Sequence, residues 1–281
     1  MRKLGFFLVV AAWGCAPKEL LPRTAQGTQV VEVRGAVRSG PHPLGRADLA
    51  KLPRLKVRGI DPRTGRSAEW EGPSLAVLVS DRVDLKHGAD TVLVRTTDGA
   101  ATPIPLPMIR QLRPVLADHV DGAPLAVAEI AWPNAEQRGL ATDPRASSWW
   151  ARDIVAFELV DWQRTFGPVL SPPEGAADAA RRGAAVYAES CIECHRLRGQ
   201  GGQRGPDLTT VASRLAPEAF TVMLPSHPGW KERRLRDSAD GESSAEVWAF
   251  LRAIASVPPS AAPAGEELAG ERAKEPGAAA P

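Results

Sequence analysis

A five-residue motif, Cys191 to His195 (C-I-E-C-H), restricts the chain more than any other part of its sequence. Residues three and four apart share a face of a helical turn, so two thiols and one imidazole in this pattern can reach one planar group. The C-x-x-C-H spacing is the attachment signature of c-type haem, in which both thiols form thioethers and the imidazole binds the iron. We therefore predict one covalent haem c, held by Cys191 and Cys194, with His195 as an axial iron ligand.

Two other sites use a pair of closely spaced cysteines. A structural zinc site requires two more ligands at close spacing, and the third cysteine of the chain, Cys15, is far away in the sequence. A thioredoxin-like dithiol requires a preceding β-α pattern, which is absent here. Neither alternative explains the motif as well as haem does.

The first fifteen residues have the pattern of a targeting segment. A positive start is followed by a short apolar run over residues 4–14, too short to span a bilayer comfortably. Residues 12–15 (A-W-G-C) resemble a lipoprotein signal, which implies cleavage before Cys15 and acylation of its thiol. Trp13 departs from that pattern, and ordinary signal cleavage is the alternative. Both routes export the protein, so we expect it on the periplasmic side of a bacterial membrane, anchored there by lipid, with residues 16–28 as a polar tether.

Short β-like runs separated by Gly, Pro and Asp extend over residues 29–165 and predict a β-rich α+β domain. The clearest run covers residues 91–97, where alternation places two valines on one face and a leucine and an arginine on the other (Val92 and Val94; Leu93 and Arg95). Asp98-Gly99 follows this run and is typical of a hairpin turn.

Several fragments of this domain occur in a fixed order: Val33-Arg34-Gly35, Ala47-Asp48-Leu49, Leu52-Pro53, Trp70 to Leu75, Thr97 to Gly99, Asp121 to Leu125 and Trp132 to Asn134. Together they resemble the molybdopterin-binding domain of the sulfite oxidase fold, which implies that fold for residues 29–165. The family binds molybdenum through a cysteine thiolate, a soft ligand that hydroxyls replace poorly, but residues 29–165 contain no cysteine. We therefore expect a domain without molybdopterin that serves as a docking or structural module. Its histidines are scattered and lack metal-ligand spacing (His42, His87, His119).

Residues 166–177 are rich in Pro and Gly and predict a linker. Residues 178–256 then predict an all-α haem domain, in which an Ala-rich helix over 179–190 leads into the C-x-x-C-H motif and an apolar helix over 247–254 closes the domain. Residues 257–281 contain almost no large apolar side chains, and we expect a disordered tail.

The haem domain closely resembles class I cytochrome c. The resemblance implies that the first and last helices cross at three positions that match the family (Gly183, Tyr187, Phe250). It also implies that the carbonyl oxygen of Pro206 accepts the second ring N–H of His195 and so fixes the ring. The Gly-rich residues 199–202 between the motif and this support are interpreted as a flexible loop.

The sixth iron ligand departs from the family pattern. The family usually supplies a methionine just before the last helix, and residues 225–241 contain none. Met223 and His227 are the two nearby substitutes. A thioether ligand raises the reduction potential of the haem, a second imidazole leaves it lower, and an open position allows small ligands to bind.

We therefore expect an exported mono-haem cytochrome that transfers single electrons between redox proteins. A sulfite-dehydrogenase-like oxidoreductase, or its haem subunit, is the first alternative, and a haem-based sensor of small ligands is the second. Four basic residues form a cluster that we interpret either as a solvated loop or as a surface for an acidic redox partner: Lys231, Arg233, Arg234 and Arg236. The net charge of +2 gives no reason to expect nucleic acid as a partner.

Overall fold

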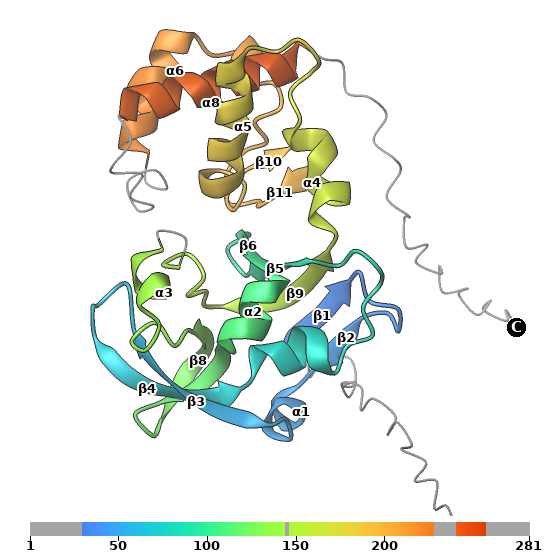
Figure 1. The fold of residues 1–281 in the computed structure, drawn as a ribbon, viewed down its shortest axis with the longest axis vertical. Coiled ribbons are helices and arrows are strands. Elements are labelled where there is room, and N and C mark those ends of the chain that lie inside the picture. Colours follow the sequence, from blue (N-terminus) through green and yellow to red (C-terminus); the bar gives the residue numbers. More distant parts are fainter. Residues whose placement is uncertain (1–29, 144–145, 228–239, 257–281) are drawn as a thin grey trace, which may run out of the picture.

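The computed structural model of the chain describes residues 30–143, 146–227 and 240–256. The expected signal segment with Cys15, the tether, the basic cluster and the tail lie outside these residues. The predicted fold class is confirmed, because a β-rich amino-terminal part is followed by a helical part (Figure 1). Among the described residues, no helix combines the length and the apolar character needed to cross a membrane.

Two β-sheets form the amino-terminal domain. The first has the order β2-β1-β9-β5-β6, with β1 and β9 parallel and the other pairs antiparallel. The second is antiparallel and has the order β3-β4-β7-β8. Their bounds are β1 Val31–Gly35, β2 His42–Leu44, β5 Thr91–Thr96, β6 Ala101–Pro105 and β9 Ile154–Val160 in the first, and β3 Arg54–Ile60, β4 Ser67–Pro73, β7 Val115–Val120 and β8 Ala123–Ala131 in the second.

Short helices cover the connections of this domain: α1 Arg46–Ala50, the π-helical turn η1 Val77–Asp81, α2 Leu106–Leu112 and α3 Arg138–Thr142. Both sheets contribute to one hydrophobic core, as Val33 and Phe157 of the first sheet and Trp70 and Ile130 of the second show. Successive side chains of a strand point to opposite faces of its sheet. One face of each sheet therefore contributes its side chains to the core between the two sheets.

Strand β5 takes part in two cores at once, and the side chains on its two faces are those that its alternation predicts. Val92 and Val94 are buried in the core between the two sheets, whereas Leu93 belongs to the core of the haem domain. Val160, at the end of β9, joins Leu93 there. The outer face of the first sheet is therefore covered by the part of the chain that follows it.

Helix α4, Trp162–Leu170, occupies the start of the expected linker. The Asp161 carboxylate caps it by accepting a hydrogen bond from the Arg164 N–H at 2.9 Å, and Phe166 is buried. The interpretation of residues 166–170 as linker was wrong because burial of this apolar face stabilises a helix despite Pro168 in its interior. The helix ends before two prolines that cannot continue it.

The haem domain consists mainly of helices: α5 Asp178–Ser190, η2 Val211–Ser213, α6 Pro217–Met223, η3 Leu224–Ser226 and α8 Asp240–Ala255. A two-stranded hairpin, β10 Arg196–Leu197 and β11 Gln200–Gly201, follows the C-x-x-C-H motif. Figure 1 shows α5 and α8 crossing in this domain, with α4 at its side, where the chain continues from β9.

Candidate haem-attachment site

The last turn of α5 positions the C-x-x-C-H motif. The Cys191 N–H donates to the Tyr187 carbonyl at 2.9 Å, which closes the helix. The N–H groups of Cys194 and His195 then donate to the Cys191 carbonyl at 3.1 and 2.9 Å, so the motif folds into one compact turn. Cys191 is buried and Cys194 is partly exposed, and no disulfide joins the two.

The crossing of α5 and α8 fixes that turn in space. A Cβ atom at Gly183 would lie 1.9 Å from the Glu246 carbonyl oxygen, so only glycine permits this approach of the two helices. One turn further along, the rings of Tyr187 and Phe250 pack with centroids 5.6 Å apart. These three matched positions form a helix crossing, as the resemblance to cytochrome c implies.

The ring of His195 is prepared for metal binding. Its Nδ1 lies 2.9 Å from the Pro206 carbonyl oxygen. A carbonyl only accepts, so Nδ1 carries the proton and Nε2 keeps its lone pair. Burial lowers the pKa of His195, the Pro206 hydrogen bond opposes this effect, and nearby His227 lowers the pKa further. A neutral imidazole with a fixed tautomer is the form that binds a metal.

A tightly packed loop holds Pro206 in place. The Gly205 N–H donates to the Cys194 carbonyl at 2.8 Å, and a Cβ at Gly205 would lie 2.3 Å from Cε1 of His195. The Asp207 carboxylate accepts hydrogen bonds from the N–H groups of Gly199 and Thr209 at 3.0 and 2.8 Å. The loop therefore leaves room for the imidazole only because residue 205 has no side chain.

The interpretation of residues 199–202 as a flexible loop was wrong. Gly199 lies in the turn of the β10–β11 hairpin, Gln200 and Gly201 form its second strand, and Gly202 follows that strand. A Cβ at Gly202 would lie 1.7 Å from the Glu193 carbonyl oxygen, and one at Gly201 would lie 2.4 Å from the His195 carbonyl oxygen. These glycines are needed for close packing against the motif.

The two candidates for the sixth ligand have different surroundings in the structure. The ring of His227 faces that of His195, with centroids 5.7 Å apart and planes inclined by 50°. Met223 is the last residue of α6 and is 47% exposed. Two thiols on one turn, a partly buried imidazole with an unprotonated Nε2 and a second imidazole facing it together fit a covalently attached haem.

The histidines of the amino-terminal domain occupy separate places. His42 is buried and lies 2.7 Å from the Ser39 hydroxyl, while His119 lies 2.7 Å from the Asp118 carboxylate, which Arg54 also contacts. The described residues contain no group of three or more His, Cys, Asp or Glu side chains arranged to hold a metal ion.

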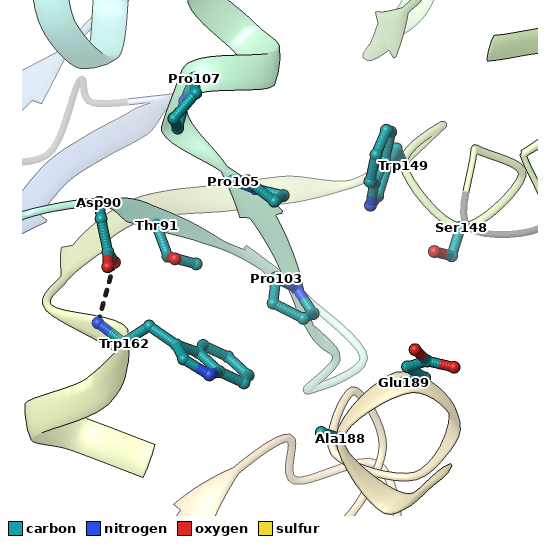
Figure 2. Close-up of a pocket in the computed structure, with 10 residues that line it drawn as sticks. All are labelled: Asp90, Thr91, Pro103, Pro105, Pro107, Ser148, Trp149, Trp162, Ala188 and Glu189. Atoms are coloured by element: carbon teal, nitrogen blue, oxygen red, sulfur yellow. Dashed lines mark hydrogen bonds between the residues drawn. The ribbon is translucent and has the colours of Figure 1, made fainter. Parts of the chain in front are cut away.

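Sequence reasoning did not find a cavity of about 380 Å³ at the domain boundary (Figure 2). Its walls come from five separate parts of the chain: Asp90 and Thr91; Pro103, Pro105 and Pro107; Ser148 and Trp149; Trp162; and Ala188 and Glu189. The Asp90 carboxylate accepts a hydrogen bond from the Trp162 N–H at 2.9 Å and so closes one side. These residues are far apart in the sequence and come together only in the folded chain, so no local sequence pattern predicts the cavity.

The family model for cytochrome c matches residues 180–221, which include the whole C-x-x-C-H motif and Pro206. Those residues are a cytochrome c domain. This domain implies haem c as the cofactor and electron transfer as the chemistry.

No curated protein matches the chain. Among solved structures, the sulfane dehydrogenase SoxCD from Paracoccus pantotrophus is similar, with a TM-score of 0.38 and 14% sequence identity. The similarity covers 50% of this chain and 40% of that chain.

Proposed function

We propose that the protein is an exported mono-haem c-type cytochrome that passes single electrons between redox proteins. The observation that carries this proposal is the prepared ring of His195, which presents a free Nε2 beside two thiols on one turn. The haem, when bound, supplies a reversible one-electron couple at its iron. The residues of the chain fix its position, its ligands and its exposure to partners.

Each residue of the site has a distinct task in this proposal. Cys191 and Cys194 would hold the haem covalently, and His195 would be a ligand of its iron. Pro206 prevents rotation of the imidazole and keeps the proton on Nδ1. A ligand ring that is already in place needs little rearrangement when the iron changes its charge, which favours fast electron transfer.

His227 is our proposed ligand on the other side of the iron. It faces His195, whereas Met223 ends α6 about half exposed. Two imidazole ligands give a lower reduction potential than an imidazole and a thioether. The protein would then donate electrons more readily than a cytochrome with methionine as its sixth ligand.

The amino-terminal domain serves, in this proposal, as a docking module without molybdopterin. Support comes from its sequence, which lacks a cysteine to bind molybdenum. The alternative, a sulfite-dehydrogenase-like oxidoreductase or its haem subunit, is favoured by the ordered fragments that resemble the sulfite oxidase fold. The proposed localisation, on the outer side of the membrane through acylated Cys15, rests on the signal-like residues 1–15.

Spectra of the oxidised holoprotein test the ligands directly. We expect low-spin haem in the wild type and in Met223→Ala, and a high-spin spectrum in His227→Ala because the iron loses one ligand. Carbon monoxide should bind reduced His227→Ala at once and the wild type slowly or not at all. A near-infrared methionine–iron band in the wild type that disappears in Met223→Ala would overturn the assignment of His227.

The same preparations separate carrier, enzyme and sensor. Metal analysis should find about one iron per chain and no stoichiometric molybdenum. Stoichiometric molybdenum, or oxidation of sulfite by the protein alone, would establish the enzyme instead of the carrier. Immediate binding of carbon monoxide to the wild type would favour the sensor.

A further inference from the structure

The tip of the β5–β6 hairpin lies directly against the haem-attachment loop. We call residues 96–101 the hairpin tip. The Gln203 N–H donates to the Gly99 carbonyl at 2.6 Å, and the Ala101 N–H donates to the Glu193 carbonyl at 2.9 Å. Gly99 has φ +88°, and a Cβ there would lie 3.1 Å from the Gln203 carbonyl carbon. Backbone groups of the two domains are thus paired within the residues that attach the haem.

A charged pair spans the same boundary. Arg204 of the haem domain directs Nη1 at the Cys194 sulfur, 3.8 Å away, and its Nη2 forms an ion pair with the Asp98 carboxylate of the hairpin tip. The Cys194 sulfur would become one of the two thioethers that hold the haem. The guanidinium therefore lies between a carboxylate of one domain and a haem-attaching sulfur of the other.

Asp98 is held in place by its own hairpin. Its Oδ1 accepts hydrogen bonds from the Thr96 hydroxyl and from the Ala100 N–H, while Oδ2 contacts Arg204. Burial opposes ionisation, but these hydrogen bonds keep the pKa of Asp98 below its usual range. Both members of the pair are therefore charged at neutral pH, and the carboxylate keeps its position without the arginine.

We propose that Asp98 and Arg204 set the reduction potential of the haem across the domain boundary, Arg204 raising it and Asp98 lowering it. This inference rests on the proposed function of the haem site. Oxidation adds one positive charge to the iron, so a fixed cation near the haem edge disfavours the oxidised state and a fixed anion favours it. The amino-terminal domain then tunes the cofactor of its neighbour with a carboxylate of its own.

The expected effect is modest. The side chains of Arg204 and Asp98 are 44% and 51% exposed, so water and salt screen their charges. We expect each single change of charge to alter the reduced-to-oxidised ratio, at a fixed ambient potential, by about threefold. Added salt should shrink the effect, because it screens exposed charges.

The rival explanation is a purely structural contact that keeps water away from the haem edge. If that were its whole role, breaking the pair from either side would expose the same edge and shift the potential in the same direction. A charge effect gives opposite directions instead. The two single variants therefore distinguish the explanations without a separate measurement of folding.

Spectroelectrochemical titration of the holoprotein provides the test. Asp98→Asn should raise the potential, Arg204→Gln should lower it, and the double variant should lie near the wild type. Arg66→Gln and Asp121→Asn, which break an ion pair of the amino-terminal domain, are matched controls and should leave it unchanged. Shifts in the same direction, or no shift in either variant, would overturn the inference. A wild type without covalent haem would instead overturn the proposed function.

Discussion

The two domains differ in how each completes its hydrophobic core. The amino-terminal domain buries its large side chains between its own two sheets, with Val33, Trp70 and Phe157 among them. The core of the haem domain includes Leu93 and Val160, which belong to the sheet of its neighbour. The core of the haem domain is therefore completed by the outer face of that sheet. In the proposed function a covalent haem is its second contribution from outside the domain.

Among the variants that test this difference between the domains, Leu93→Ala should cause the largest loss of stability. Leu93 is 2% exposed in the core of the haem domain, and truncation of a buried leucine costs about 2–5 kcal/mol. We expect the thermal transition followed by haem absorbance to move to lower temperature. Near-ultraviolet circular dichroism of the tryptophans, most of which lie in the other domain, should change less.

Val92→Ala is the control for Leu93→Ala, because its side chain points into the core between the two sheets. It should lower the transition seen through the tryptophans and affect the haem signal less. Equal shifts of one common transition in both variants would show that the domains unfold together, and the contrast between their cores would then have no thermodynamic meaning.

A smaller effect is expected at the helix crossing of the haem domain. Gly183→Ala places a methyl group where the Glu246 carbonyl oxygen lies, and such overpacking costs about 1–3 kcal/mol. Gly139→Ala in α3 is its counterpart in the amino-terminal domain, since a Cβ there meets nothing within 4 Å. Chemical denaturation should show a loss of stability only for Gly183→Ala. An unchanged midpoint would mean that α5 and α8 can move apart at little cost.

The sequence predicts those features whose cause is local. The alternation over 91–97 correctly assigned Leu93 and Val92 to opposite faces, because the period of a strand is two residues. The helix before Cys191 followed equally from its Ala-rich composition. What the alternation did not reveal is that both faces would be buried, one of them by another domain.

The features that sequence reasoning missed depend on contacts between distant residues. Gly167-Pro168 suggested a linker, yet burial of Phe166 and Val169 makes the segment helical. The glycines at 201 and 202 suggested flexibility, yet they pack against carbonyl groups of the C-x-x-C-H turn. Asp98 was placed in a turn, but no local pattern links it to Arg204, 106 residues away.

The smallest predicted loss of stability concerns the carboxylate of Asp207, in the loop that carries Pro206. Partial burial raises the pKa of Asp207, but hydrogen bonds from Thr209 and Gly199 lower it by more, so the pKa lies below its usual range. Its contribution to stability is therefore complete above the unfolded-state pKa of about 3.9 and is lost as the pH falls through the lowered value. Asp118 of the amino-terminal domain has a lowered pKa as well, but there the hydrogen-bond donors include the Arg54 guanidinium.

Asp207→Asn should cost the haem domain about 1 kcal/mol near neutral pH, the usual worth of a hydrogen bond, and progressively less below pH 4. Denaturation followed by haem absorbance at several pH values measures this difference. Salt should change it little, because two of the donors are neutral backbone amides, whereas Asp118→Asn should matter less at high salt. A loss of stability in Asp207→Asn that remained constant down to pH 3 would show that the carboxylate does not hold the loop around Pro206. Packing of the glycines of that loop would then be what holds it.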